Sequence, residues 1–184
     1  MKKLILTIVA FLGLFVDAMA QTATHGVDIT INSVAMIRAV HINGSTPENQ
    51  NFIVEAPTTS GGMPTNRETP NSGLYLQYTS IKTATGTPRT IKAALTTGTI
   101  PAGLAISATA FTPTGGTGDI GISNSEQTIS ATAATMIKNI GSGYTGADAG
   151  NGVSITYTAV ITAVASLVAT PSTTLTVTYT LSNE

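Results

Sequence analysis

Residues 174–181, TLTVTYTL, alternate without a break between threonine and a larger apolar side chain. A period of two residues places every second side chain on the same face of a β-strand. The stretch therefore predicts a strand with threonines facing outward and an apolar face directed inward. The inward side chains are Leu175, Val177, Tyr179 and Leu181.

Shorter stretches of the same kind recur along the chain, separated by Gly, Pro and Asn. Residues 34–42 are apolar at nearly every position, which predicts a strand buried on both faces. Many short strands joined by turn residues predict an all-β fold, which we interpret as an immunoglobulin-like antiparallel β-sandwich. The further strands are predicted at residues 27–31, 52–55, 74–80, 89–95, 104–111, 120–122, 127–129 and 153–165.

Three connecting segments complete the prediction. Asn43-Gly44 is a strong turn signal. Residues 56–73 are polar and rich in Pro and Gly, which predicts a long loop in place of a strand pair. Residues 132–140 fit a helical spacing, but the short length and the Gly residues that follow favour a strand or a single turn.

The first twenty residues have the order of a secretory signal peptide. Lys2 and Lys3 precede an apolar run over residues 4–16, and Ala18-Met19-Ala20 supplies the small residues of a cleavage site. A membrane anchor is the alternative, but the run is shorter than the about 20 residues that a spanning helix needs. We therefore expect a signal peptide at 1–20 and one secreted domain at 21–184, with no membrane span in the mature chain.

Composition excludes several classes of function. The chain has Cys 0, which excludes disulfides and an N-terminal lipid anchor. Charged residues make up 9% of it, against about 25% in an ordinary globular protein. The formal net charge is −1, and removal of the signal peptide makes it more negative. A nucleic-acid partner requires a basic surface, so we expect none.

Residue types that carry catalysis are scarce. The two histidines, His25 and His41, lie far apart in the sequence and do not form a zinc-ligand pattern. No Gly-x-Ser-x-Gly motif is present, and the carboxylates are scattered singly. We therefore expect no catalytic residue, no metal site and no cofactor, and a protein that is not an enzyme.

A Gly-rich loop over residues 141–152 is the best candidate for a ligand site. Most aromatic side chains fall at core-facing strand positions, whereas Tyr144 lies in this loop. Its ring either stacks on a sugar or packs beneath the loop. Asp148 and Asn151 add oxygen atoms, but one carboxylate is too little for calcium.

Assembly is the second candidate. Val27, Ile29 and Ile31 form an alternating stripe close to the predicted mature N-terminus. Such a strand can complete the sheet of another copy by β-augmentation, or it can pair within its own domain. Three buried aliphatic side chains contribute roughly 5–9 kcal/mol, which is comparable to the stability of a whole domain. The terminal strand, 174–181, is the other segment available for such pairing.

The second half of the chain resembles a family. The quoted motifs are Ile91-Lys92-Ala93, Ile100-Pro101-Ala102-Gly103-Leu104, residues 140–146 (IGSGYTG), Thr156-Tyr157 and residues 175–180 (LTVTYT). Together, over residues 74–181, they resemble secreted bacterial β-sandwich proteins related to spore coat U and Csu-type fimbrial subunits. The resemblance implies a structural role at the cell surface and no catalytic residues. Fimbrial subunits often carry a cysteine pair, and this chain departs from that pattern.

Two functions follow from the sequence. The first is a non-enzymatic surface subunit of a filament or matrix, which associates with other copies through strand pairing by residues 27–31 or 174–181. The alternative is a monomeric adhesin or glycan-binding module that uses the loops at 56–73 and 141–152.

Overall fold

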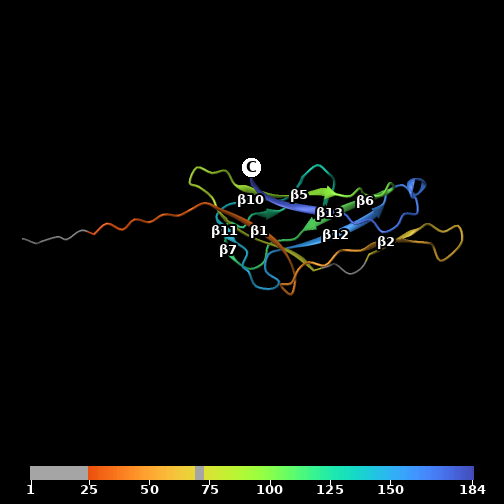
Figure 1. Ribbon diagram of the computed structural model, residues 1–184, viewed down its shortest axis with the longest axis horizontal. Coiled ribbons are helices and arrows are strands. Elements are labelled where there is room, and N and C mark those ends of the chain that lie inside the picture. The colour runs from red at the N-terminus through yellow and green to blue at the C-terminus, as the bar shows by residue number, and fades with distance from the viewer. Residues whose placement is uncertain (1–24, 69–72) are drawn as a thin grey trace, which may run out of the picture. The chain divides into compact units, whose positions relative to one another are not determined.

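The computed structural model describes residues 25–68 and 73–184 (Figure 1). The predicted signal peptide, residues 1–20, lies outside the described residues. The chain divides into two units, Met1–Ile31 and Asn32–Glu184. In the described part of the chain, no helix has the length and hydrophobicity required to cross a membrane.

The second unit consists of β-strands joined by turns, with one short 3₁₀ segment, η1 (Val164–Ser166). The longer strands are β1 (Val34–His41), β2 (Phe52–Glu55), β3 (Thr65–Glu68), β4 (Leu74–Ile81), β5 (Arg89–Thr97), β6 (Leu104–Ala110), β10 (Ala134–Ile140), β12 (Val153–Ile161) and β13 (Thr176–Asn183). The two-residue strands are β7 (Thr117–Gly118), β8 (Ile122–Ser123), β9 (Gln127–Thr128) and β11 (Gly143–Tyr144).

Among the described residues these strands form three sheets, and every pairing is antiparallel. The larger sheet has the order β7-β11-β4-β12-β6-β9, with β1 added beside β4. The second sheet has the order β13-β5-β10-β8, and β2 and β3 form a separate pair. Figure 1 shows β5 and β13 side by side, with β12 running beneath them.

The hydrophobic core lies between the two larger sheets. Leu76, Val153 and Ile155 come from the larger sheet, and Ile91 and Met136 come from the four-stranded sheet. All five side chains are fully buried. Burial of one apolar face from each of two antiparallel sheets defines a β-sandwich, so the predicted all-β sandwich is confirmed.

The terminal strand predicted over residues 174–181 is present but is shifted to residues 176–183, so Leu175 lies outside it. In β13, Val177, Tyr179 and Leu181 are half-buried and pack against the core, and the intervening threonines are exposed. The segment 132–140, which fitted both a helix and a strand, forms β10.

Residues 34–42 are not the strand buried on both faces that their composition predicts. β1 pairs along its whole length with β4 and lies at the edge of its sheet. Val40 is the one buried side chain of β1, and Met36 is 67% exposed. The prediction is wrong because an apolar run does not by itself reveal whether neighbouring strands cover both faces. The turn at Asn43-Gly44 is confirmed, since Gly44 N donates to His41 O at 2.7 Å.

Residues 56–73 are not wholly a loop, because they include β3. β3 pairs with β2 in a hairpin, and Arg67 Nε forms an ion pair with Glu55 Oε1 at 2.6 Å. The sequence TNRE has no apolar alternation, so the period of two that identifies a strand is missing. Backbone pairing, which the sequence pattern does not report, holds this strand in place.

Residues 27–31 do not form the predicted strand. No strand is assigned between residues 25 and 33. A strand requires a neighbour to satisfy its backbone N–H and C=O groups, and within the described chain this segment is in no sheet.

Candidate functional site

The N-terminal stripe is the first part of the candidate site and consists of Val27, Ile29 and Ile31. Their side chains are 73%, 81% and 77% exposed, respectively. Isolated exposed apolar residues are ordinary on protein surfaces. An alternating set of three on one short segment is typical of a surface that contacts a partner.

The predicted terminal strand is occupied on one side. β13 pairs with β5 from Thr176 to Asn183, and Leu175 lies just before it, half-buried. Its outer edge has no strand partner within the described residues. The apolar face of β13 therefore belongs to its own core, and only its backbone edge is available to a partner.

β1 provides a second edge with an unusual apolar side. Ala35, Ile37 and Ala39, here called the β1 inner face, lie opposite Ser80, Tyr78 and Leu76 of β4. These three residues of β4 are buried, and directly opposed residues share one face of an antiparallel pair. The β1 inner face therefore points toward the core side of the sheet, yet Ala35 and Ala39 are exposed and Ile37 is half-buried.

Arg38 joins this edge to the Gly-rich loop. Its Nε and Nη2 donate to Gln77 Oε1 at 2.9 and 2.6 Å, and Nη2 also donates to Ala147 O at 3.1 Å. Gln77 is buried, and its Nε2 donates to Asp148 O at 2.8 Å and Asn151 O at 3.0 Å. The side chains of Arg38 and Gln77 thus fix the backbone of the loop.

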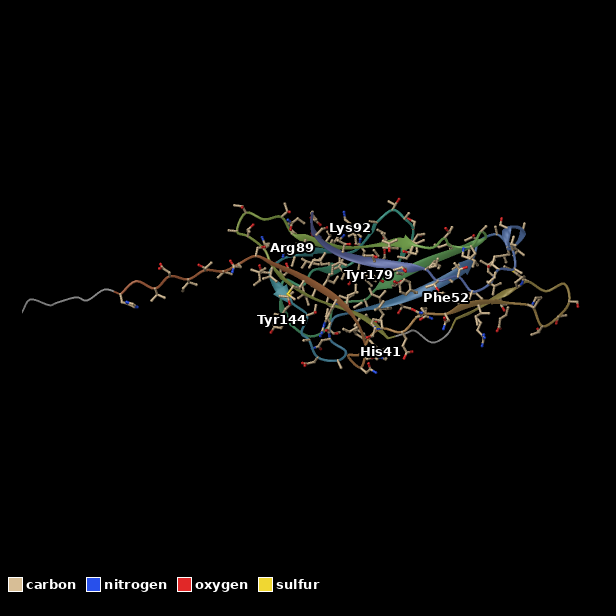
Figure 2. All side chains as sticks on the ribbon, viewed as in Figure 1. His41, Phe52, Arg89, Lys92, Tyr144 and Tyr179 are labelled. Atoms are coloured by element: carbon tan, nitrogen blue, oxygen red, sulfur yellow. The ribbon has the colours of Figure 1, made fainter. Side chains whose placement is uncertain are left out.

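Tyr144 lies on the outer face of the same sheet. It is opposite Thr79 of β4, which in turn is opposite Met36 of β1. Tyr144 is 48% exposed, so packing beneath the loop, the alternative left open by the sequence, does not occur. Figure 2 shows Tyr144 on the side of β7 and β11, away from Lys92 and Tyr179. A groove of about 430 Å³ is lined by Met36, Ile37, Arg38, Gln77, Tyr78, Thr79, Tyr144, Gly146 and Ala147.

The three predicted ligand residues do not converge. Tyr144 lines the groove, whereas Asp148 and Asn151 are not among its lining residues. Asp148 is exposed, and the side chain of Asn151 packs against Gly115 and Gly146, where it leaves no room for a Cβ atom. Asn151 therefore shapes the loop and does not present a ligand oxygen to the groove.

Arg89 is a buried cation at the end of both sheets (Figure 2). Its guanidinium donates to Val34 O, to Ser80 Oγ at 3.0 Å, to Ser33 Oγ at 2.9 Å and to Asn183 Oδ1 at 3.2 Å. These partners are neutral, and they belong to the start of β1, to β4 and to the end of β13. Arg89 therefore fastens the two edge strands to each other.

Three buried tyrosines join neighbouring parts of the sandwich through their phenol groups. Tyr157 Oη and Tyr179 Oη are 2.7 Å apart and connect β12 to β13. Burial raises the pKa of both phenols above the ordinary value, and for Tyr179 the neighbouring Tyr157 raises the pKa further. Burial also raises the pKa of Tyr78, whose Oη donates to Ile120 O at 2.5 Å. All three remain neutral at physiological pH.

The two histidines belong to the N-terminal segment and to the end of β1. His25 is exposed, and His41 Nδ1 accepts a hydrogen bond from Asn43 N at 3.3 Å in the turn after β1. Within residues 25–68 and 73–184, no group of three His, Cys, Asp or Glu side chains could hold a metal ion.

Sequence reasoning missed Arg38, Gln77 and Arg89. Arg38 carries a signal, because it is the single charged residue in an otherwise apolar run. Gln77 and Arg89 carry none, since their roles depend on which strands become neighbours.

Comparison of the chain with protein-family models, curated proteins and solved structures finds no match. The class that the structure defines is an antiparallel β-sandwich. The immunoglobulin-like topology and the resemblance to fimbrial subunits stay predictions.

Proposed function

We propose that the protein is an exported, non-enzymatic structural subunit that assembles at the cell surface by pairing strands between copies. The observation that carries the proposal is the N-terminal stripe, whose three aliphatic side chains are 73–81% exposed and belong to no strand in the described chain. The sequence pattern is that of a strand with one buried face, so a partner's sheet is the environment it fits.

A comparison of free energies favours strand pairing over a hydrophobic contact alone. Burial of the stripe contributes roughly 5–9 kcal/mol. Association costs about 4–15 kcal/mol in lost translational and rotational freedom. The stripe alone offsets only the lower part of that cost. Backbone hydrogen bonds to a sheet edge supply the remainder, and both β1 and β13 present such an edge.

Replacement of Val27, Ile29 and Ile31 by Asn tests this function without changing the length of the chain. We expect the variant to be exported and folded but to stay monomeric in sedimentation, with no assemblies visible by electron microscopy. The matched control is Thr30→Ser, on the opposite face of the segment, which should assemble as the unaltered chain does. Assemblies of normal length and amount from the triple variant would overturn the proposal.

A second candidate, the monomeric glycan-binding module, is favoured by one observation. Tyr144 is exposed beside Met36 and the guanidinium of Arg38 in the groove. Aromatic rings stack on the apolar faces of sugars, and a guanidinium donates to their oxygens. Under this function the secreted chain is a stable monomer that binds a glycan array, and Tyr144→Ala loses the binding while Tyr75→Phe keeps it. Absence of binding by the unaltered chain would exclude it.

A further inference from the structure

We propose that the N-terminal stripe of one copy pairs antiparallel with the free edge of β1 of a second copy, in the register that sets Asp28 opposite Arg38. This inference rests on the proposed function and names the acceptor edge and the register. Three independent features of the described residues support it. The acceptor strand has exposed small side chains, and the charges of the two segments are complementary. The register is also one that a short turn within the same chain does not produce without removing Val34 from β1.

The acceptor strand, β1, has small side chains at the positions where the stripe has large ones. Ala35 and Ala39 point toward the core side of the sheet but are exposed, because no further strand lies beyond β1 in the described chain. With Asp28 opposite Arg38 in an antiparallel pair, Val27 falls opposite Ala39, and Ile31 falls opposite Ala35. Two large aliphatic side chains thus meet two small ones.

The remaining positions fit the same register. Ile29 falls opposite Ile37, which already packs against the core cluster. Thr30 falls opposite Met36, on the outer face with Arg38. All three residues of the stripe therefore extend the apolar inner face, and the two polar residues of the donor face solvent. A shift of one residue would reverse both faces.

Charge favours the same alignment. Arg38 donates to Gln77 Oε1 and Ala147 O, which are neutral acceptors. Asp28 is exposed and is the one carboxylate of residues 25–31. Opposite charges at directly opposed positions stabilise an antiparallel pair, and like charges destabilise it. β13 carries no charged residue from Thr176 to Asn183, so that edge offers Asp28 no such partner.

The register also explains why pairing occurs between copies. A two-residue turn at Asn32-Ser33 would set Ile31 opposite Val34 and therefore Asp28 opposite Ile37, with the carboxylate on the core side. A three-residue turn would restore the favourable faces but would remove Val34 from β1. Val34 is held there by pairing with Ile81 and by the hydrogen bond from Arg89 to Val34 O, and Ser33 Oγ donates to Ile81 O at 2.8 Å. A partner copy has no such constraint.

Crosslinking between single-cysteine copies tests the acceptor, because the chain has Cys 0. Copies with Thr30→Cys are mixed with copies with Met36→Cys and oxidised under assembling conditions. The control mixture pairs Thr30→Cys with Thr178→Cys, on the outer face of β13. Opposed residues lie within disulfide reach. We expect the 30–36 heterodimer to exceed the 30–178 heterodimer at least tenfold by mass spectrometry. A tenfold ratio corresponds to a free-energy difference of about 1.4 kcal/mol.

The result also separates this inference from the proposed function. If the unaltered chain assembles but the 30–178 product dominates, or neither product forms, the β1 edge is wrong and strand pairing as such stands. If the unaltered chain does not assemble, both fail.

Charge reversal tests the register. Asp28→Lys should weaken association about tenfold, because it sets two cations opposite each other. Arg38→Glu should weaken it similarly, and the two changes together should restore it. Since Arg38 also holds Gln77 and Ala147, thermal unfolding of each monomer serves as the control for folding. Failure of the double variant to recover, with its monomer folded, would overturn the register.

Discussion

The N-terminal stripe and β13 are two stretches with one pattern and different outcomes. Both alternate apolar and polar side chains over five residues or more. The apolar side chains of β13 are half-buried in their own core, whereas those of the stripe are 73–81% exposed. Alternation thus predicts that a segment fits a half-buried strand. It does not predict whether the strand joins the sheet of its own chain or that of a partner. The partner is determined by register and by what the chain can reach.

Removal of apolar side chains should have the largest effect, and the effect should differ between the two segments. Val177→Ala with Leu181→Ala should lower the free energy of unfolding of the monomer by about 2–5 kcal/mol, because both side chains pack against the core. Val27→Ala with Ile31→Ala should change it by less than about 0.5 kcal/mol, because exposed side chains lose little. Urea unfolding of the monomers measures both. Equal losses would show that the stripe is part of the folded domain.

Loss of Arg89 should release both edges at once. Arg89→Met should cost about 2–4 kcal/mol, because it leaves the acceptors on Val34, Ser80 and Asn183 without a donor. Hydrogen exchange should then rise at the start of β1 and the end of β13 together. Arg38→Met is the comparison, since Arg38 is an exposed residue whose partners, Gln77 and Ala147, lie neither in β13 nor at the start of β1. If Arg89→Met weakened only one of the two edge strands, Arg89 would not join them.

Alkaline pH should lower the stability of the fold through three buried tyrosines, and two of them, Tyr157 and Tyr179, join β12 to β13. Burial raises the pKa of Tyr157 and Tyr179, so the unfolded chain loses these protons first as the pH rises. Stability from these groups is complete below the unfolded pKa of about 10 and declines above it. Tyr157→Phe with Tyr179→Phe should be nearly neutral at pH 7 and should remove the part of the alkaline decline that these two phenols cause, and Tyr78 should supply the remainder. An unchanged pH dependence of urea unfolding would contradict this cause.

Much of the fold could be predicted because its longer strands carry a period of two. The inward residues of β13 came from that period, whereas the choice of a strand for 132–140 came from the short length of that segment. β3 has no apolar alternation, so its pairing with β2 could not be predicted. β1 was assigned the wrong burial because its position at an edge is a property of the whole sheet.

The candidate site could be predicted only in part. The stripe at 27–31 and the ring of Tyr144 were identified from sequence, and both are exposed. The sequence did not predict that Asn151 lies away from the groove that Tyr144 lines. This placement depends on the packing of Gly115 and Gly146 against the Asn151 side chain. The roles of Arg38 and Arg89 depend on cross-strand neighbours 39 and 9–94 residues away in sequence.

Hydrogen exchange of the backbone amides of residues 27–31, measured in the monomer and in the assembled protein, shows whether this segment is paired only between copies. In the dilute monomer these amides should exchange as fast as those of an unfolded peptide, while the amides of β13 are protected. In assemblies, amides in both segments should be protected. Protection of residues 27–31 in the monomer, or fast exchange of these amides in the assemblies, would contradict pairing between copies.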